Sequence, residues 1–136
     1  AVAKSNARKL GVLDTVAFLC SDLFGAVKRE KVFDMVLANL PYVSDDEWDV
    51  LMDDVRKYEP RKALYGGKDG ATIYRRLIDD LPHCLKDDGY VLCEVGGEGR
   101  AEQVTEMLDR VGLHVIVKKD FSYKERVLIG SWTNLS

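Results

Sequence analysis

Short apolar runs alternate with amphipathic segments along this chain, and that alternation constrains the fold more than any other feature. The runs at 16–20, 33–38 and 90–95 have the length and the side chains of buried strands. Between and around them, apolar residues recur at spacings of three and four, as on the buried face of a helix. The predicted helices cover 1–10, 45–55, 71–81 and 101–111. Strands that alternate with helices are typical of an α/β fold with a mostly parallel sheet.

The C-terminal part of the chain adds two strands, predicted at 113–118 and 126–132. The connection between them, centred on Asp120 to Lys124, is too short for a crossover helix, so the two strands should pair antiparallel. The 136 residues suit one hydrophobic core, and we predict a single domain, 1–136.

Proline and glycine are expected to interrupt these elements. Residues 58–70 contain Pro60 and three glycines and are predicted to form a loop. Pro82 should end or kink the helix at 71–81. Asp87-Asp88-Gly89 is predicted to turn the chain into the strand at 90–95.

The overall charge limits the classes of ligand that the protein is expected to bind. A net charge of −3 and a pI near 5.4 argue against a large phosphate-binding surface. An acidic cluster between Asp45 and Asp54 is predicted to be a solvated helix face. Because no apolar run approaches the ~20 residues that span a bilayer, and no cationic leader is found, neither a membrane anchor nor a secretory signal is expected.

The three cysteines are far apart and form no CxxC pair, so neither a disulfide framework nor a zinc site is predicted. Cys20 and Cys93 lie within apolar runs and are predicted to be buried, reduced thiols, which fits a cytoplasmic protein. His83 and His114 lack partners at ligand spacing, so no metal is expected.

Two polar motifs follow predicted strands, at the position where α/β sheets bind their ligands. Ser21-Asp22 follows the run at 16–20, and Asn39-Leu40-Pro41-Tyr42 follows the run at 33–38. Pro41 cannot continue a central strand, so the chain must turn there.

The second motif carries the groups that would hold a planar NH2 group. The Asn39 side chain offers one acceptor and two donors, the Leu40 carbonyl lies in a turn outside the strand ladder, and Tyr42 supplies a flat wall. Hydrogen bonds from both amine hydrogens would fix the plane of an amide or aromatic amine, so that a sulfonium methyl can approach its nitrogen in line. From these four residues alone, the favoured interpretation is a turn that ends the strand and has no role in catalysis.

The surroundings of the motif add to this interpretation. Asn39 to Tyr42 fits the pattern [NDS]-[IVLP]-P-[YFW] of Rossmann-like amino-methyltransferases. Further similarities cover nearly the whole chain, at Ser21-Asp22-Leu23-Phe24, Tyr58-Glu59-Pro60, Gly66 to Gly70, Tyr74 to Ile78, Gly89 to Gly96 and Glu125 to Leu128. Together they make the chain similar to the release-factor glutamine methyltransferases (HemK/PrmC type), in which the motif is usually Asn-Pro-Pro-Tyr.

The resemblance implies an S-adenosylmethionine-dependent enzyme that methylates the side-chain amide of a glutamine in a peptide chain release factor, within its Gly-Gly-Gln loop. It implies that Asn39 and the Leu40 carbonyl orient this amide and that Tyr42 packs on it. Pro41 completes the catalytic turn, and Glu94 either orients the substrate or is held in an ion pair. The release factor would be the protein partner, in the cytoplasm.

The resemblance also implies which residues of this chain bind the cofactor and which parts of the cofactor site lie elsewhere. It implies that Asp22, with Leu23 and Asn39, contacts S-adenosylmethionine, the Asp22 carboxylate accepting from the adenine amine. It implies that the first strands of the Rossmann-like fold and their glycine-rich loop lie outside this chain. Residues 96–99 are not a substitute, because they lack the GxGxxG spacing and no acidic strand end follows about 20 residues later.

We therefore expect a chain truncated at its N-terminus that binds the cofactor weakly or not at all. Open apolar sheet edges would favour self-association.

Two other functions stay open. The same four residues could methylate an adenine amine in a nucleic acid, since Asn-Leu-Pro-Tyr is common in ribosomal RNA adenine dimethyltransferases, although the acidic pI counts against it. Alternatively, the chain is a non-catalytic piece that packs against a partner carrying the missing strands.

Overall fold

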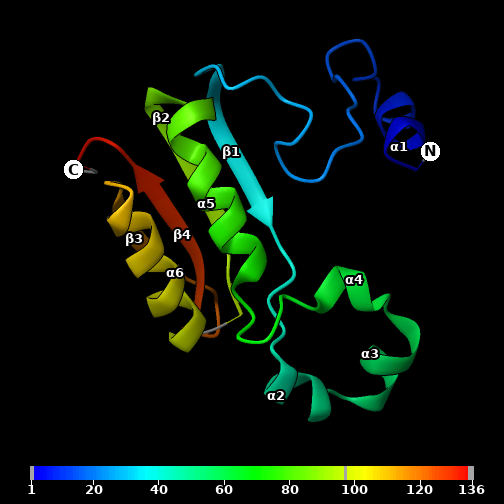
Figure 1. Cartoon of the computed structure of the whole chain (residues 1–136). Coiled ribbons are helices and arrows are strands. Elements are labelled where there is room, and N and C mark those ends of the chain that lie inside the picture. The colour runs from blue at the N-terminus through cyan, green and yellow to red at the C-terminus, as the bar shows by residue number, and fades with distance from the viewer. Residues whose placement is uncertain (1, 97, 135–136) are drawn as a thin grey trace.

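The computed structural model describes residues 2–96 and 98–134, and of Glu98 only the backbone. In chain order the elements are α1 (Val2–Lys9), β1 (Phe33–Asn39), α2 (Asp45–Asp49), α3 (Asp53–Tyr58), α4 (Arg61–Leu64), α5 (Thr72–Cys84), β2 (Leu85–Glu94), α6 (Glu98–Arg110), β3 (His114–Lys119) and β4 (Glu125–Ser131). Helices α5 and α6 lie on one face of the sheet, while α2 to α4 form a group beyond the end of β1 (Figure 1). Helix α1 lies apart from the sheet in the same view.

The four strands form one sheet in the order β1-β2-β4-β3. β1 and β2 are parallel, and β4 is antiparallel to both of its neighbours, so β1, β2 and β3 point the same way and only β4 is reversed. This arrangement confirms the predicted α/β fold and the predicted antiparallel C-terminal pair. The insertion of β4 between β2 and β3 was not predicted.

The hydrophobic core lies between the sheet and the two helices that cover it. Its fully buried side chains come from both layers and include Tyr74, Ile78, Leu81, Leu85, Val91, Cys93, Val104, Leu108 and Leu128. On β1, side chains alternate between the faces: Val36 is buried, whereas Met35 and Leu37 are 52% and 71% exposed. β1 therefore covers the core with one face only, and among the described residues it has a strand neighbour on one side only.

The strand predicted at 16–20 is wrong. These residues belong to no strand, and Val16, Phe18 and Leu19 are 42%, 37% and 64% exposed. A strand needs a neighbour to share its backbone hydrogen bonds, and no described strand lies beside this run. For the same reason Cys20 is exposed, against expectation, while Cys93 is buried as predicted.

The single helix predicted at 45–55 is wrong, because two short helices occupy this stretch. Ser44 and Glu47 form a capping box that begins α2, and α2 ends at Asp49. The chain begins a second helix at Asp53, where Asp53 and Asp54 supply the acidic first turn that a helix N-terminus favours. The loop expected at 58–70 also contains one short helix, α4.

Two further boundaries differ from the predictions. Helix α5 continues through Pro82 to Cys84, because Leu81 and Cys84 are buried and hold its last turn on the sheet. Asp87-Asp88-Gly89 is no turn between elements but a bulge within β2. Phe33 pairs with Leu85 and Met35 with Tyr90, so β2 contains three more residues than β1 over this interval.

Within the described part of the chain, no helix is both long and apolar enough to cross a bilayer. The same residues contain no cluster of three or more His, Cys, Asp or Glu side chains that could hold a metal ion.

Candidate active site

The ends of two parallel strands place the predicted motif beside Glu94. Asn39 is the last residue of β1, Glu94 is the last residue of β2, and the two are partners in the register. Because parallel strands end at the same edge of a sheet, both side chains lie at the carboxyl edge, where such sheets bind ligands. From there the chain continues directly into the group of helices α2 to α4 (Figure 1).

A cavity of about 510 Å³ lies at this edge. One part of its wall comes from the strand ends and the predicted motif: Asn39, Leu40, Pro41, Tyr42, Val43 and Glu94. The other part comes from residues 51–64: Leu51, Val55, Glu59, Ala63 and Leu64. The residues predicted as catalytic and as substrate-binding are therefore brought together around one cavity.

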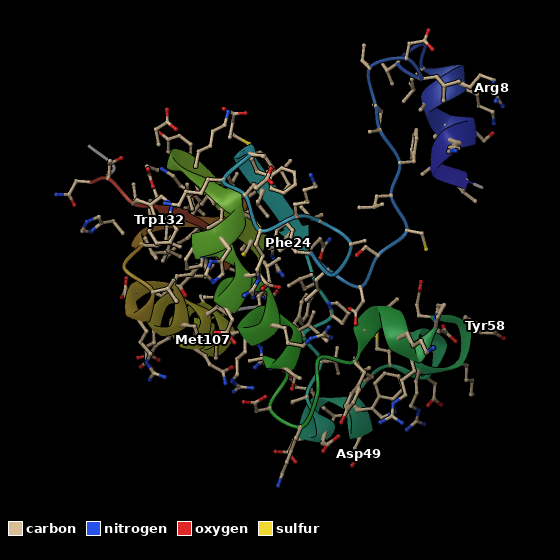
Figure 2. All side chains as sticks on the ribbon, turned by 45° about the horizontal axis from the view of Figure 1, so that its top comes forward. Arg8, Phe24, Asp49, Tyr58, Met107 and Trp132 are labelled. Carbon is tan, nitrogen blue, oxygen red and sulfur yellow. The ribbon has the colours of Figure 1, made fainter. Side chains whose placement is uncertain are left out.

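Sequence reasoning missed the second part of the wall. Leu51 and Val55 were interpreted as the inner face of one helix, and Glu59 only as part of a family-like loop. The sequence did contain a signal for this wall. Residues 51–64 include apolar side chains but no predicted strand, and such side chains are expected to pack against another part of the molecule. In Figure 2, Asp49 and Tyr58 lie on the outer side of these helices, and the exposed fraction of Tyr58 is 82%.

Asn39 and the Leu40 carbonyl are free to bind a ligand. Asn39 is exposed, and its side chain forms no hydrogen bond with any described residue. The Leu40 carbonyl also accepts no hydrogen bond within the described part, because β1 ends one residue earlier and the following bonds begin at Val43. Asn39 and Leu40 both line the cavity, and the acceptor oxygens of the Asn39 side chain and the Leu40 carbonyl have no hydrogen-bond partner among the described residues.

The backbone around Tyr42 is fixed by hydrogen bonds and by glycines. The Val43 N–H donates to the Leu64 carbonyl (2.8 Å), and the Gly66 N–H donates to the Val43 carbonyl (2.9 Å). A Cβ at Gly66 would lie 2.6 Å from the Pro41 carbonyl oxygen and 2.8 Å from the Tyr42 Cα. Only glycine therefore permits this close approach of the two chain segments.

The ring of Tyr42 packs on the backbone of Gly96, the second residue after β2. A Cβ at Gly96 would lie 2.6 Å from both Cδ2 and Cε2 of this ring. Residues 96–99 were predicted to be a turn between strand and helix. The structure adds that Gly96 leaves room for the aromatic wall.

The end of β2 is held rigidly. The Tyr74 hydroxyl donates to the Glu94 carbonyl, and Arg126 Nη1 donates to the Val95 carbonyl (3.1 Å). Tyr74 is fully buried, and this burial raises the pKa of its hydroxyl, which stays a donor. The Glu94 carboxylate forms no ion pair with a described residue, so the alternative of a salt-bridged Glu94 is not supported.

Asp22 and Leu23 lie outside this cavity. Asp22 does not follow a strand, since the run at 16–20 is unpaired, and its carboxylate forms an ion pair with Arg76 of α5 (2.7 Å). Leu23 has a φ of 49° and packs against the core. Phe24, which is labelled in Figure 2, contacts Phe33 at the start of β1. The loop is therefore anchored to α5 and to the start of β1, while Asn39 alone of the predicted cofactor residues lines the cavity.

Comparison with solved structures identifies the fold. The chain superposes on the ribosomal protein L11 methylase of Lactobacillus delbrueckii subsp. bulgaricus with a TM-score of 0.62 and 19% identity, over 93% of this chain and 49% of that one. It superposes on the human Mettl16 catalytic domain, solved with the MAT2A 3'UTR hairpin 1, with a TM-score of 0.68 and 16% identity, over 97% of this chain and 51% of that one. The fold is that of the Rossmann-like methyltransferases.

Comparison of sequences identifies the family within this class. The chain is 39% identical to the release factor glutamine methyltransferase of Clostridium botulinum over 127 residues, which are 92% of this chain and 44% of that protein. It is 37% identical over 130 residues to the enzyme of the same name from Clostridium acetobutylicum, over 94% of this chain and 45% of that protein. No family model matches the chain. The chain belongs to the release factor glutamine methyltransferase family, and it spans less than half the length of these curated relatives.

Proposed function

We propose that this chain carries the amide-binding part of an S-adenosylmethionine-dependent methyltransferase that acts on a glutamine side chain of a peptide chain release factor. The observation that carries the proposal is the pair of free acceptors, Asn39 and the Leu40 carbonyl, on the wall of one cavity with Tyr42. The names of the relatives support the same substrate. Such a substrate places the protein in the cytoplasm.

In the proposed reaction, the residues of the cavity act mainly by holding the substrate amide in position for methyl transfer. The two amide hydrogens of the substrate donate to Asn39 and to the Leu40 carbonyl, and the ring of Tyr42 holds the amide plane. Fixed acceptors favour positive charge on the nitrogen as its bond to the methyl carbon forms. The nitrogen then loses a proton to the water that reaches the exposed Asn39.

S-adenosylmethionine supplies a methyl group on a positively charged sulfur, which is left as a neutral thioether. The chain offers this cofactor a partial site: Asn39 at the cavity, and the carboxylate of Asp22 with the apolar Leu23 beside it. The Asp22 carboxylate remains 76% exposed despite its ion pair with Arg76, so it keeps an acceptor for an amine. These residues fit the cofactor but surround little of it.

The charge of the cavity favours a peptide over a nucleic acid. Glu59 and Glu94 both line it, and neither carboxylate forms an ion pair with a described residue. Two uncompensated carboxylates attract N–H donors and repel phosphates. A protein amide therefore suits the cavity better than a base on a phosphate backbone.

A methyl-transfer assay with tritiated S-adenosylmethionine tests the proposal on the intact protein, with release factor and ribosomal RNA as acceptors. We expect label on the release factor, and a rate about 100-fold lower in Asn39→Ala, the scale of losing one fixed hydrogen-bond partner. The free energy of unfolding should change by less than about 0.5 kcal/mol, because Asn39 is exposed.

Asn6→Ala is the matched control, since Asn6 is an exposed asparagine in α1. Its rate should equal that of the parent. Equal rates for Asn39→Ala and the parent would end the proposal, and label on ribosomal RNA alone would point instead to an adenine amine as the substrate. No transfer to either acceptor would favour a non-catalytic piece that requires a partner.

A further inference from the structure

Arg100, in the first turn of α6, connects that helix to the segment that follows Tyr42. Its side chain is only 10% exposed. Nη1 donates to the Asp69 carbonyl and to Gln103 Oε1 (2.5 Å), and Nη2 donates to Glu47 Oε2 (3.1 Å). One guanidinium thus joins α6 to α2 and to the loop that precedes α5.

The hydrogen bond from Arg100 to Glu47 connects α6 to the residues that directly follow Tyr42. Glu47 Oε2 also accepts from the Ser44 N–H (2.8 Å), and Ser44 Oγ accepts from the Glu47 N–H (3.3 Å). Burial works against ionisation of Glu47, but the hydrogen bonds from Ser44 and the charge of Arg100 outweigh it and lower its pKa. Glu47 therefore stays ionised and holds Ser44, two residues after Tyr42.

The bond to Asp69 fixes the other end of the segment. Gln103 Nε2 donates to Asp69 Oδ2 (3.2 Å), so two residues of α6 contact Asp69. Next to it, a Cβ at Gly70 would collide with both the Arg100 guanidinium and the Tyr42 carbonyl. Arg100 therefore lies against the chain on both sides of the cavity wall, at residues 42–47 and at 69–70.

We propose that Arg100 is a positioning residue, which holds residues 43–70 against α6 and so keeps Tyr42 and the 51–64 wall in register with Asn39. Arg100 itself does not line the cavity. It acts through Glu47 and Asp69. Its effect on catalysis rests on the proposed function, whereas its effect on the segment does not.

Hydrogen exchange of the full chain tests the positioning without any substrate. In Arg100→Ala, amides in 43–70 should exchange about tenfold faster or more, because a buried charged partner is lost. Amides in β2 and β4 should keep their rates. Arg110→Ala is the matched control, since Arg110 lies on the same helix, is 76% exposed and pairs only with Glu106 among the described residues. It should change neither region.

Unchanged exchange in 43–70 would overturn the proposal, and so would an equal increase across β2 and β4, which would show a general loss of stability. If Arg100→Ala does not fold, Glu47→Gln removes the negative charge that faces Arg100 in one of its contacts and keeps the shape of the side chain. It should give a smaller increase confined to 43–70. Arg100→Lys should restore part of the protection, because one ammonium can replace only some of these bonds.

Steady-state methyl transfer by the intact protein, rather than by the 136-residue chain alone, provides the second readout. Arg100→Ala should lower kcat about tenfold and leave the KM for the methyl donor within about twofold, since a misplaced wall affects the reacting geometry. A raised KM for the methyl donor with an unchanged kcat would contradict this role. If the parent shows no transfer while the exchange result holds, the proposed function fails and the positioning of the segment stands.

Discussion

Gly96 and Tyr42 show at the residue scale how the site depends on the absence of a side chain. The Tyr42 ring occupies the space that a Cβ at position 96 would need. Tyr42 is half-buried on the wall of a cavity, so its ring can move aside. A larger residue at 96 should therefore disturb the site more than the fold.

We expect Gly96→Ala to lower methyl transfer about tenfold, the scale of a small misplacement of the acceptor wall. The free energy of unfolding should fall by no more than about 1 kcal/mol, because a side chain rather than backbone must shift. Gly99→Ala is the matched control three residues later, where a Cβ meets nothing within 4 Å. It should be neutral or slightly stabilising in the first turn of α6.

Rates from the transfer assay and urea unfolding curves would check both variants. A Gly96→Ala protein with full activity would show that the Tyr42 ring is not needed in its observed position. A Gly99→Ala protein with the same loss would assign the effect to α6 rather than to Tyr42.

At the scale of elements, Asp69 holds the loop before α5 through a network of hydrogen bonds. The Arg75 guanidinium, chiefly by hydrogen bonding, lowers the pKa of this carboxyl to about 2, from 3.8 in an unstructured chain. Burial raises this pKa, but by less than the hydrogen bond from Arg75 lowers it, and the N–H of Ala71 lowers it further. Asp69 is 42% exposed, so solvent screening keeps the contribution of the ion pair modest.

The sign of the pH dependence follows from the lowered pKa. The stability that ionised Asp69 contributes is fully present above pH 3.8 and is lost as the pH falls towards 2. Asp69→Asn should therefore be less stable than the parent at pH 7, and the difference should shrink below pH 3.8. Thermal unfolding between pH 2 and 7 measures it, with Asp88→Asn as the control, since Asp88 is exposed and forms no ion pair with a described residue. A difference that is constant with pH would contradict the role of Asp69.

At the scale of the whole molecule, the described residues enclose little of a cofactor. Asn39 lines the cavity, but Asp22 and Leu23 lie beside α5, and the run at 16–20 has no strand partner. Among the described residues β1 has no strand neighbour on its outer edge, which is consistent with this open arrangement. The expected self-association through that edge stays a prediction.

We expect the isolated chain to bind S-adenosylmethionine weakly or not at all, because so few contacts are available. Isothermal titration calorimetry of the 136-residue chain checks this expectation. The intact protein, measured in the same way, is the control. A micromolar affinity of the isolated chain would contradict it.

Some of this protein could be predicted from its sequence. Apolar periodicity predicted the strands at 33–38 and 90–95, the C-terminal antiparallel pair and α6. It could do so because an element that buries one face repeats its apolar residues at a spacing that is visible within a few neighbouring residues. The motif at 39–42 was placed correctly at a strand end, since proline must break the ladder there. The periodicity of 45–55 was a weaker guide, because capping by Ser44 and a second acidic start at Asp53 divided that segment into two helices.

The sequence alone determined the composition of the site: an amide, a free carbonyl and an aromatic ring in four consecutive residues. Only the tertiary structure decided what surrounds them, because the wall at 51–64, the space left by Gly96 and the contacts of Arg100 join residues far apart in the chain. It also decided that the run at 16–20 is no strand. Apolar content gives a segment the capacity to pair, whereas a strand exists only where another strand shares its hydrogen bonds.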